Sequence, residues 1–289
     1  MNTENRLKVA KTYKLYIGGK FPRTESGRTF EARSTKGHLL ANLCQASRKD
    51  MREAVVAARK AFSDWSQRSG YNRGQILYRI AEMLEGRTAQ FTDELIAQGA
   101  TTAKAKRELE TTVERLVHYA GWADKYSQLH SSVNPVASSH FNFSVPEPMG
   151  IVGILSPDEP ALLGLVSLLA PTLAGGNVVV AHLSETRPLA PSTFAEVLND
   201  SDVPAGVVNL LTGYRDELLP TLASHMDVNA VLSSGLSPEQ KKLVEENATL
   251  NLKRTAYLSG KSITDASHPG LSPILNLQET KTTWHPIGS

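Results

Sequence analysis

Cysteine is almost absent from this sequence, because Cys44 is the only one among 289 residues. A single thiol excludes an internal disulfide and any metal site built from several cysteines. Excess charge of one sign is also missing, since 31 Lys and Arg residues stand against 29 Asp and Glu residues and leave a net charge of +2. This balance gives no reason to expect nucleic acid or an anionic membrane surface as a partner.

Long apolar runs are missing as well. The stretch from Leu162 to Leu173 is interrupted by Gly164, Ser167 and Pro171, and it is too short to span a bilayer. The N-terminal stretch from Met1 to Lys14 is polar and lacks the apolar centre of a signal peptide. We therefore expect a cytoplasmic protein, which the single cysteine also suits. Nothing in the sequence predicts a metal site.

The first half of the chain is predicted to be mainly helical. Tyr13 to Ile17 alternates and ends at a Gly-Gly pair, as a strand entering a tight turn does, and a weaker extended stretch covers residues 38–47. From Lys49 to Trp65 the apolar residues then recur at helical spacing. Helical patterning resumes over residues 73–84, 89–97 and 103–126.

The second half alternates strands and helices in regular order. Short apolar runs bounded by Gly and Pro predict strands at residues 150–155, 178–182, 207–211 and 229–232. Helical segments lie between these strands, at residues 160–174, 191–198 and 216–224. Strand–helix–strand order with short connections predicts a parallel, doubly wound sheet. The expected fold class is therefore α/β, with N-terminal helices preceding the sheet.

Several sequence blocks in order resemble the aldehyde dehydrogenase superfamily, and they extend over nearly the whole chain. The blocks are Tyr16-Ile17-Gly18-Gly19-Lys20, Tyr119-Ala120-Gly121-Trp122-Ala123, Glu147-Pro148-Met149-Gly150-Ile151-Val152-Gly153-Ile154, Ala174-Gly175-Gly176-Asn177, Pro204-Ala205-Gly206-Val207-Val208-Asn209 and Asn251-Leu252-Lys253. The resemblance implies a Rossmann-like sheet and a β-strand oligomerisation arm. Within the superfamily, Pro157-Asp158-Glu159 and the tail around Trp284 are most similar to the noncatalytic C-terminal half of the family 16 proteins.

The resemblance divides the chain into two parts. Residues 1–262 match an N-terminal, dinucleotide-binding-type domain, with an arm hairpin at about residues 138–149. Residues 263–289 form a tail in which Glu279 to Trp284 resembles the family's C-terminal oligomerisation strand. The chain leaves the family pattern near Ser262 and rejoins it at this strand, so we expect the catalytic domain to be absent. The retained arm implies a full-length aldehyde dehydrogenase as partner, or a homo-oligomer; the alternative is that Trp284 and Ile287 merely fill the local core.

Aldehyde oxidation in this family requires a thiolate nucleophile, a carboxylate base, an oxyanion-hole amide and a nicotinamide dinucleotide. The nucleophile would lie in the missing domain, and Cys44 is interpreted as a small buried hydrophobe. Tyr257 stands at the position of the base, where a phenol with a reference pKa near 10 performs poorly at neutral pH. Glu159 replaces the oxyanion-hole Asn and would repel a developing oxyanion unless protonated. No catalytic residue is therefore predicted.

Two interpretations of the acidic motif stay open at this point. One makes Asp158 and Glu159 a catalytic acid pair. The other explains both as acidic residues ahead of a helix N-terminus, where the helix dipole favours negative charge. Neighbouring residues need not face one another, so the second interpretation is preferred.

NAD or NADP is implied as cofactor only through the resemblance. Glu185 could accept hydrogen bonds from ribose hydroxyls, whereas His182 replaces the family's Lys and is expected to face solvent, with metal or cofactor ligation as the alternative. Leu236 follows Gly235 in place of a Ser, and Glu239 would disfavour phosphate at the next helix N-terminus. We expect weak residual binding at most. The candidate remnants of a cofactor site are Ser156, His182, Ser184, Glu185, Gly213 and Gly235.

Three hypotheses for function follow. The leading one is a noncatalytic aldehyde dehydrogenase-like subunit, a pseudoenzyme that binds a full-length aldehyde dehydrogenase or itself. The second is an NAD(P)-binding protein that performs or assists aldehyde oxidoreduction. The third is a decayed remnant without a role, against which the coherent helix and strand patterning argues.

Overall fold

The computed structural model describes residues 9–265 and 270–288. Parts of the polar N-terminal stretch and of the predicted tail therefore lie outside the described residues. At the centre is a five-stranded sheet with the order β10-β9-β6-β7-β8, in which every neighbouring pair is parallel. Its strands are β6 (Ile151–Leu155), β7 (Val178–His182), β8 (Val208–Leu211), β9 (Val228–Ser233) and β10 (Arg254–Tyr257). The predicted doubly wound sheet is confirmed.

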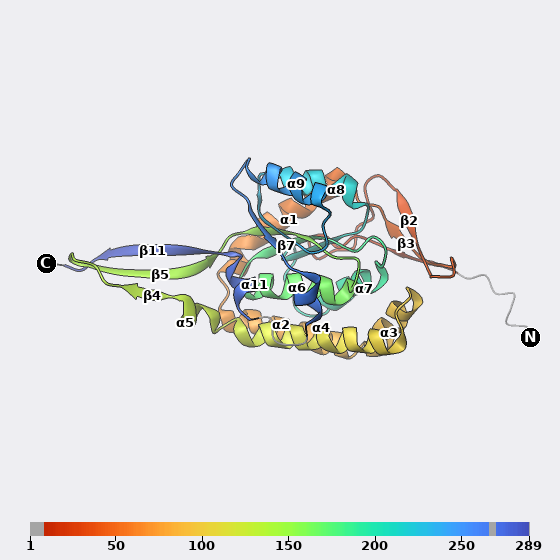
Figure 1. Cartoon of the computed structure of the whole chain (residues 1–289), viewed down its shortest axis with the longest axis horizontal. Helices are drawn as coiled ribbons and strands as arrows, with labels where there is room; N and C mark the ends of the chain where they lie inside the picture. Colours follow the sequence, from red (N-terminus) through yellow and green to blue (C-terminus); the bar gives the residue numbers. More distant parts are fainter. Residues whose placement is uncertain (1–8, 266–269, 289) are drawn as a thin grey trace, which may run out of the picture.

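Helices cover both faces of this sheet (Figure 1). On one face lie α1 (Arg48–Ser66), α8 (Arg215–Ser224) and α9 (Pro238–Ala248). On the other face lie α6 (Ala161–Ala174) and α7 (Leu189–Asn199). An outer layer packs against α6 and α7 and consists of α2 (Gly70–Glu85), α3 (Thr88–Ala97) and α4 (Thr102–Trp122).

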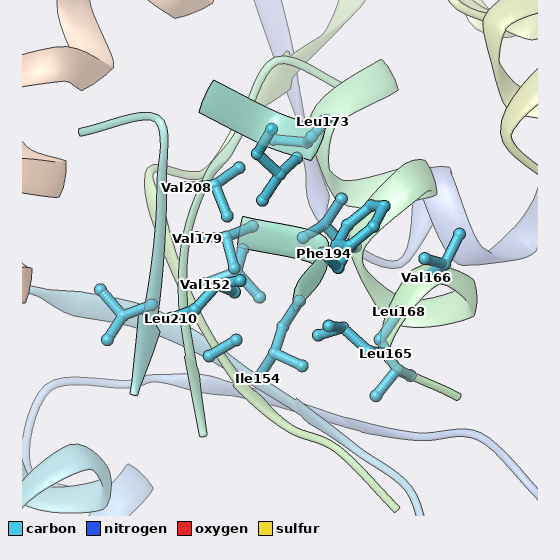
Figure 2. Packing of buried hydrophobic residues seen from close by; sticks show 14 of the residues in the cluster. Val152, Ile154, Leu165, Val166, Leu168, Leu173, Val179, Phe194, Val208 and Leu210 are labelled. Carbon is cyan, nitrogen blue, oxygen red and sulfur yellow. The ribbon is translucent and has the colours of Figure 1, made fainter. Parts of the chain in front are cut away.

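The helix α6 is buried along its entire length, because the sheet covers one side and the outer helices cover the other. An apolar surface all the way round is what such a position requires. Figure 2 shows Leu165 and Leu168 of this helix packed beside Val152 and Ile154 of β6. Among the described residues, no helix is long and apolar enough to cross a membrane.

A small second sheet precedes the helices. It contains β1 (Lys11–Tyr13), β2 (Thr29–Arg33) and β3 (Leu39–Cys44) in the order β1-β3-β2. The predicted strand from Tyr13 to Ile17 is displaced toward the N-terminus, because β1 ends at Tyr13. Tyr16 leaves this sheet to bridge Leu210 of β8, with N···O distances of 3.0 and 2.8 Å.

The third sheet forms an arm that projects from the body (Figure 1). It contains β4 (Ser132–Asn134), β5 (His140–Pro148) and β11 (Gln278–Pro286) in the order β11-β5-β4. All nine residues of β11 pair antiparallel with β5. The short helices α5 (Tyr126–His130), α10 (Gly260–Thr264) and α11 (Ser272–Leu275) connect these parts. Between α10 and β11 the described residues contain only α11, so the chain passes from the parallel sheet to the arm without a further α/β domain there.

Candidate functional site

The candidate site lies at the carboxyl ends of the parallel strands. After β6, the chain adds β7 and β8 on one side and then returns to place β9 on the other side. Open α/β sheets bind ligands in the crevice at such a switch point, outside the carboxyl ends of the strands. Ser156 follows β6, Ser184 and Glu185 follow β7, and Gly235 follows β9. The structure thus gathers the predicted cofactor positions, together with Gly213 after β8, at one edge of the sheet.

Asp158 is the centre of a hydrogen-bond cluster at this edge. Its Oδ1 accepts from Ser184 Oγ at 2.8 Å and from the backbone N–H groups of Glu185 at 3.0 Å and Thr186 at 3.3 Å. Burial alone would raise the pKa of Asp158, but these hydrogen bonds and the charge of Arg215 outweigh it and hold the pKa below its usual value. The loop after β6 is therefore tied to the loop after β7.

Glu185 is engaged with the main chain. Its Oε1 accepts from the backbone N–H of Arg215, the first residue of α8, so the carboxylate caps that helix. Burial raises the pKa of Glu185, although this hydrogen bond and the Arg215 charge oppose the effect. The Arg215 side chain is itself buried, and its Nη2 donates to the carbonyl oxygen of Ser156 at 2.6 Å. One oxygen of the carboxylate that a ribose diol would need is thus already bound to the main chain.

His182 does not face solvent, and the prediction that it does was wrong. It ends the interior strand β7 beneath the loop after β8, and none of its surface is exposed. Because a carbonyl oxygen can only accept, Nε2–H must donate to Gly213 O, which lies 2.8 Å away. Burial lowers the pKa of His182 to about 4, so the ring is neutral at physiological pH. A buried neutral imidazole with one hydrogen bond to the main chain has a structural role.

The N-terminus of α9 is closed by a capping box. Ser237 Oγ accepts from Gln240 N at 3.2 Å, and Gln240 Oε1 accepts from Ser237 N at 3.2 Å. Pro238, the first residue of the helix, has no N–H to offer. Gly235 keeps a backbone conformation with φ +76°, but a Cβ placed there would lie 3.8 Å from Pro157. The loop after β6 therefore reaches across the switch point to the loop after β9.

Asp158 and Glu159 do not act as a pair. Glu159 is 59% exposed and forms an ion pair of 3.0 Å with Arg187, whereas Asp158 turns to the β7 loop. Neither residue caps α6. That role belongs to Glu108, whose Oε1 accepts from Leu162 N at 2.9 Å and from Leu163 N at 3.3 Å. Both acidic residues still lie just ahead of α6, where the helix-dipole interpretation places them, but the hydrogen-bonding cap comes from a residue on α4 that sequence reasoning missed.

Tyr257 and Cys44 do not belong to the hydrogen-bond cluster around Asp158. Tyr257 ends the edge strand β10, and Lys241 Nζ lies 4.5 Å from the centre of its ring. Burial raises the pKa of the Tyr257 phenol, which moves it further from use as a base. Cys44 is 2% exposed, so its interpretation as a small buried hydrophobe is confirmed. Among the residues that the structure places, no cluster of His, Cys, Asp and Glu could hold a metal ion.

The crevice does not match the needs of a nicotinamide dinucleotide. Glu185 is bound to the start of α8, Asp158 fills the donor groups of the β7 loop, and the capping box uses the start of α9. A dinucleotide that used the donors of the β7 loop would first have to displace the Asp158 carboxylate.

Comparisons with known proteins find one family along most of this chain. The model of the aldehyde dehydrogenase family matches residues 23–264. The chain is 31% identical over 267 residues to an aldehyde dehydrogenase of Aspergillus niger, covering 91% of this chain and 53% of that protein. It is 34% identical over 257 residues to retinal dehydrogenase 2 of Gallus gallus, covering 86% and 49%. The chain thus spans about half the length of these relatives.

Solved structures give the same result for the fold. The NAD+ complex of an aldehyde dehydrogenase from Bacillus cereus superposes with a TM-score of 0.81 at 26% identity, covering 86% of this chain and 51% of that one. HpcC from Thermus thermophilus superposes with a TM-score of 0.82 at 28% identity, covering 86% and 48%.

Proposed function

Since the chain belongs to the aldehyde dehydrogenase family, we propose that it is a noncatalytic subunit, a pseudoenzyme that associates with a full-length aldehyde dehydrogenase or with further copies of itself. The observation that carries this proposal is the arm, whose outer strand β11 pairs with β5 along one edge and with no described strand along the other. The residues that stand at the family's catalytic positions support the proposal that the subunit is noncatalytic.

The chemical argument rests on what stands at each position. Glu159 is ion-paired to Arg187 where the family resemblance calls for an amide donor, and a carboxylate cannot stabilise a developing oxyanion. Tyr257 is a phenol with a raised pKa where a carboxylate base is needed. Cys44, the only thiol, is buried in the N-terminal region. These residues favour a role other than aldehyde oxidation.

The association argument rests on the strand β11. One edge of β11 pairs with β5, and its other edge pairs with no strand among residues 9–265 and 270–288. A strand edge of nine residues presents unpaired N–H and C=O groups, which natural proteins cover or block. Trp284 and Ile287 are 58% and 54% exposed, so the alternative that they fill the local core is wrong.

Both faces of the arm carry exposed aromatic surface. Phe141 is 44% exposed, and its ring centroid lies 5.6 Å from that of Phe143 on the same face. Trp284 pairs with Asn142, whose side chain points to the opposite face. Aromatic residues are enriched at the centres of protein interfaces. An arm with two such faces and an open edge favours insertion between subunits.

The test is isolation of the protein from its own cells, followed by measurement of the native mass and identification of its companions. A defined complex with an active aldehyde dehydrogenase, or a defined homo-oligomer, is the expected result. A monomeric chain without such a companion contradicts the association. The purified chain should form no NADH from aldehydes, and turnover at an enzyme-like rate that Cys44→Ala leaves unchanged contradicts the noncatalytic role.

A second candidate, a cofactor-binding protein that assists aldehyde oxidoreduction, draws on Glu185 and on the retained turn at Gly235, with φ +76°. Titration with NAD separates the two candidates. Saturable binding that a bulky residue at Gly235 abolishes would favour the second.

A further inference from the structure

The Asp158 carboxylate fills a small binding site made by its own chain. Ser184 Oγ, Glu185 N and Thr186 N all donate to its Oδ1, over distances of 2.8, 3.0 and 3.3 Å. Donors that converge on one oxygen from successive residues form a nest suited to an anionic or hydroxyl oxygen of a ligand. In this chain the oxygen comes from the loop after the neighbouring strand.

Arg215 binds both the end of β6 and the loop after β7, and so holds the two loops together. Its guanidinium is buried and donates to Ser156 O at 2.6 Å, at the end of β6. Its backbone N–H takes up the Glu185 carboxylate. The positive charge of Arg215 also lowers the pKa of Asp158 and so favours its charged form. One arginine therefore stabilises both acidic residues of the cluster.

Pro157 fixes the other side of the loop. A Cβ on Gly164 of α6 would collide with the Pro157 ring, so the loop packs directly on the helix backbone. On its far side, the Pro157 Cβ would lie 3.8 Å from a Cβ placed on Gly235, so the loop stands close to the turn after β9. The segment of residues 156–160 is thus anchored to α6, to the β7 loop and near the β9 loop.

We propose that residues 156–160 close the nucleotide crevice from within, with Asp158 as an internal ligand, and that loss of this carboxylate opens a site for an adenosine ribose. Removing it frees three donors on the β7 loop at the edge where open α/β sheets bind nucleotides. The inference concerns the isolated chain and does not depend on a partner subunit.

The opened site is confined to the adenosine half of a dinucleotide. The start of α9 stays closed, because the Ser237–Gln240 capping box and Pro238 do not involve Asp158. AMP is therefore the appropriate probe, and NAD should gain no more affinity than AMP does.

Glu159 provides a matched control for the experiment. Asp158→Ala and Glu159→Ala each remove one carboxylate from adjacent positions of the same loop. Glu159 is exposed and forms its ion pair with Arg187 at 3.0 Å, whereas the three donors of the β7 loop converge on Asp158. Wild type and both variants are titrated calorimetrically with AMP and with NAD.

We expect neither ligand to saturate the wild type or Glu159→Ala at millimolar concentrations. Asp158→Ala should bind AMP at least about tenfold more tightly, a difference of about 1.4 kcal/mol. Saturable binding of either ligand by the wild type overturns the closure. A folded Asp158→Ala variant without gained affinity, or a Glu159→Ala variant with the same gain, overturns the assignment to Asp158.

Amide hydrogen exchange tests the internal ligand even where Asp158→Ala fails to fold. The N–H groups of Glu185 and Thr186 should exchange slowly in the ligand-free wild type and in Glu159→Ala, since both donate to Asp158. Unprotected exchange of both amides in the wild type overturns the proposal. Failure of this inference leaves the subunit role intact, because that role is read from native mass and companions.

Discussion

The Nε2 atom of His182 lies 2.8 Å from the carbonyl oxygen of Gly213, and this contact fixes the imidazole as the neutral tautomer with its proton on Nε2. The other ring nitrogen, Nδ1, is buried and has no hydrogen-bond partner among residues 9–265 and 270–288. Protonation would place a charge on this unpartnered atom, which explains why burial lowers the pKa of His182 to about 4.

This relationship predicts how stability changes with pH. The unfolded chain binds the His182 proton near pH 6.5 and the folded chain only near pH 4, so the free energy of unfolding falls as pH decreases through that window. The full loss amounts to about 3 kcal/mol, at 1.36 kcal/mol per pKa unit. Chemical denaturation of wild type and His182→Gln at pH 7, 5.5 and 4 checks it. Gln keeps a donor without titrating, so an equal pH slope in the two proteins would contradict the assignment.

A second prediction concerns the cap of α6. Glu108→Ala leaves the amides of Leu162 and Leu163 without their acceptor and should cost about 1 kcal/mol. Burial raises the pKa of Glu108, which means that the folded state disfavours the ionised carboxylate. The stability that protonated Glu108 contributes is therefore fully present below the pKa that this residue has in the unfolded chain. It decreases as pH rises through the higher pKa of the folded state.

Glu108→Gln separates the two effects, since an amide oxygen can still accept but carries no charge. We expect the free energy of unfolding of this variant to lie within about 0.5 kcal/mol of the wild-type value at pH 7. Equal destabilisation by Ala and by Gln, measured in urea, would show that the charge of Glu108 rather than its acceptor matters.

The sheet could be predicted from the sequence because its signals are local. A strand buried on both faces needs consecutive apolar residues, and Val178–His182 and Ile151–Leu155 have them together with flanking Gly or Pro. The helix α6 was equally readable, since its neighbours on both sides demand an apolar surface. In these elements, the residue types themselves indicate that both sides are buried.

The contacts in the crevice could not be predicted, because each joins residues far apart in sequence. Glu108 caps a helix 54 positions later, and Asp158 binds a loop 26 to 28 positions later. His182 was expected at the surface because a strand end is usually open, but the loop at Gly213 covers it. Position in the sequence indicated where the site lies, and only the packing revealed that its polar groups are already paired.

The Asn251-Leu252-Lys253 block, one of the family-like blocks, has a structural explanation that yields a third prediction. Lys253 is 6% exposed, and its Nζ donates to His225 O at 2.9 Å, Val228 O at 2.6 Å and Asn251 Oδ1 at 3.1 Å. Lys253→Met keeps the aliphatic length but leaves these acceptors unpaired, at a cost of about 2 kcal/mol.

Lys242 on α9 is the matched control for Lys253, because its side chain is 76% exposed and forms a surface ion pair of 3.7 Å with Glu246. Lys242→Met should change the free energy of unfolding by less than about 0.5 kcal/mol. If the two Met variants unfold at the same denaturant concentration, the buried hydrogen bonds of Lys253 contribute nothing measurable.

The last prediction concerns Trp284 on the arm. The residue is 58% exposed, and its ring contacts that of His140 edge-on, with ring centroids 5.8 Å apart. Trp284→Ala removes little buried surface from the isolated chain, so its thermal midpoint should stay close to that of wild type. If the arm inserts between subunits, the same change should weaken association at least about tenfold, as expected for an interface tryptophan.

Tyr71→Ala is the appropriate comparison for Trp284→Ala, because Tyr71 is a 66% exposed aromatic residue on α2, in the outer helical layer rather than on the arm. Native mass measured over a dilution series gives the dissociation constant of each variant. Weakening by Trp284→Ala but not by Tyr71→Ala assigns the contact to the arm, since both changes remove exposed aromatic surface. Equal dissociation constants for wild type and Trp284→Ala would remove Trp284 from the interface, and a larger effect of Tyr71→Ala would move that interface to the helical layer.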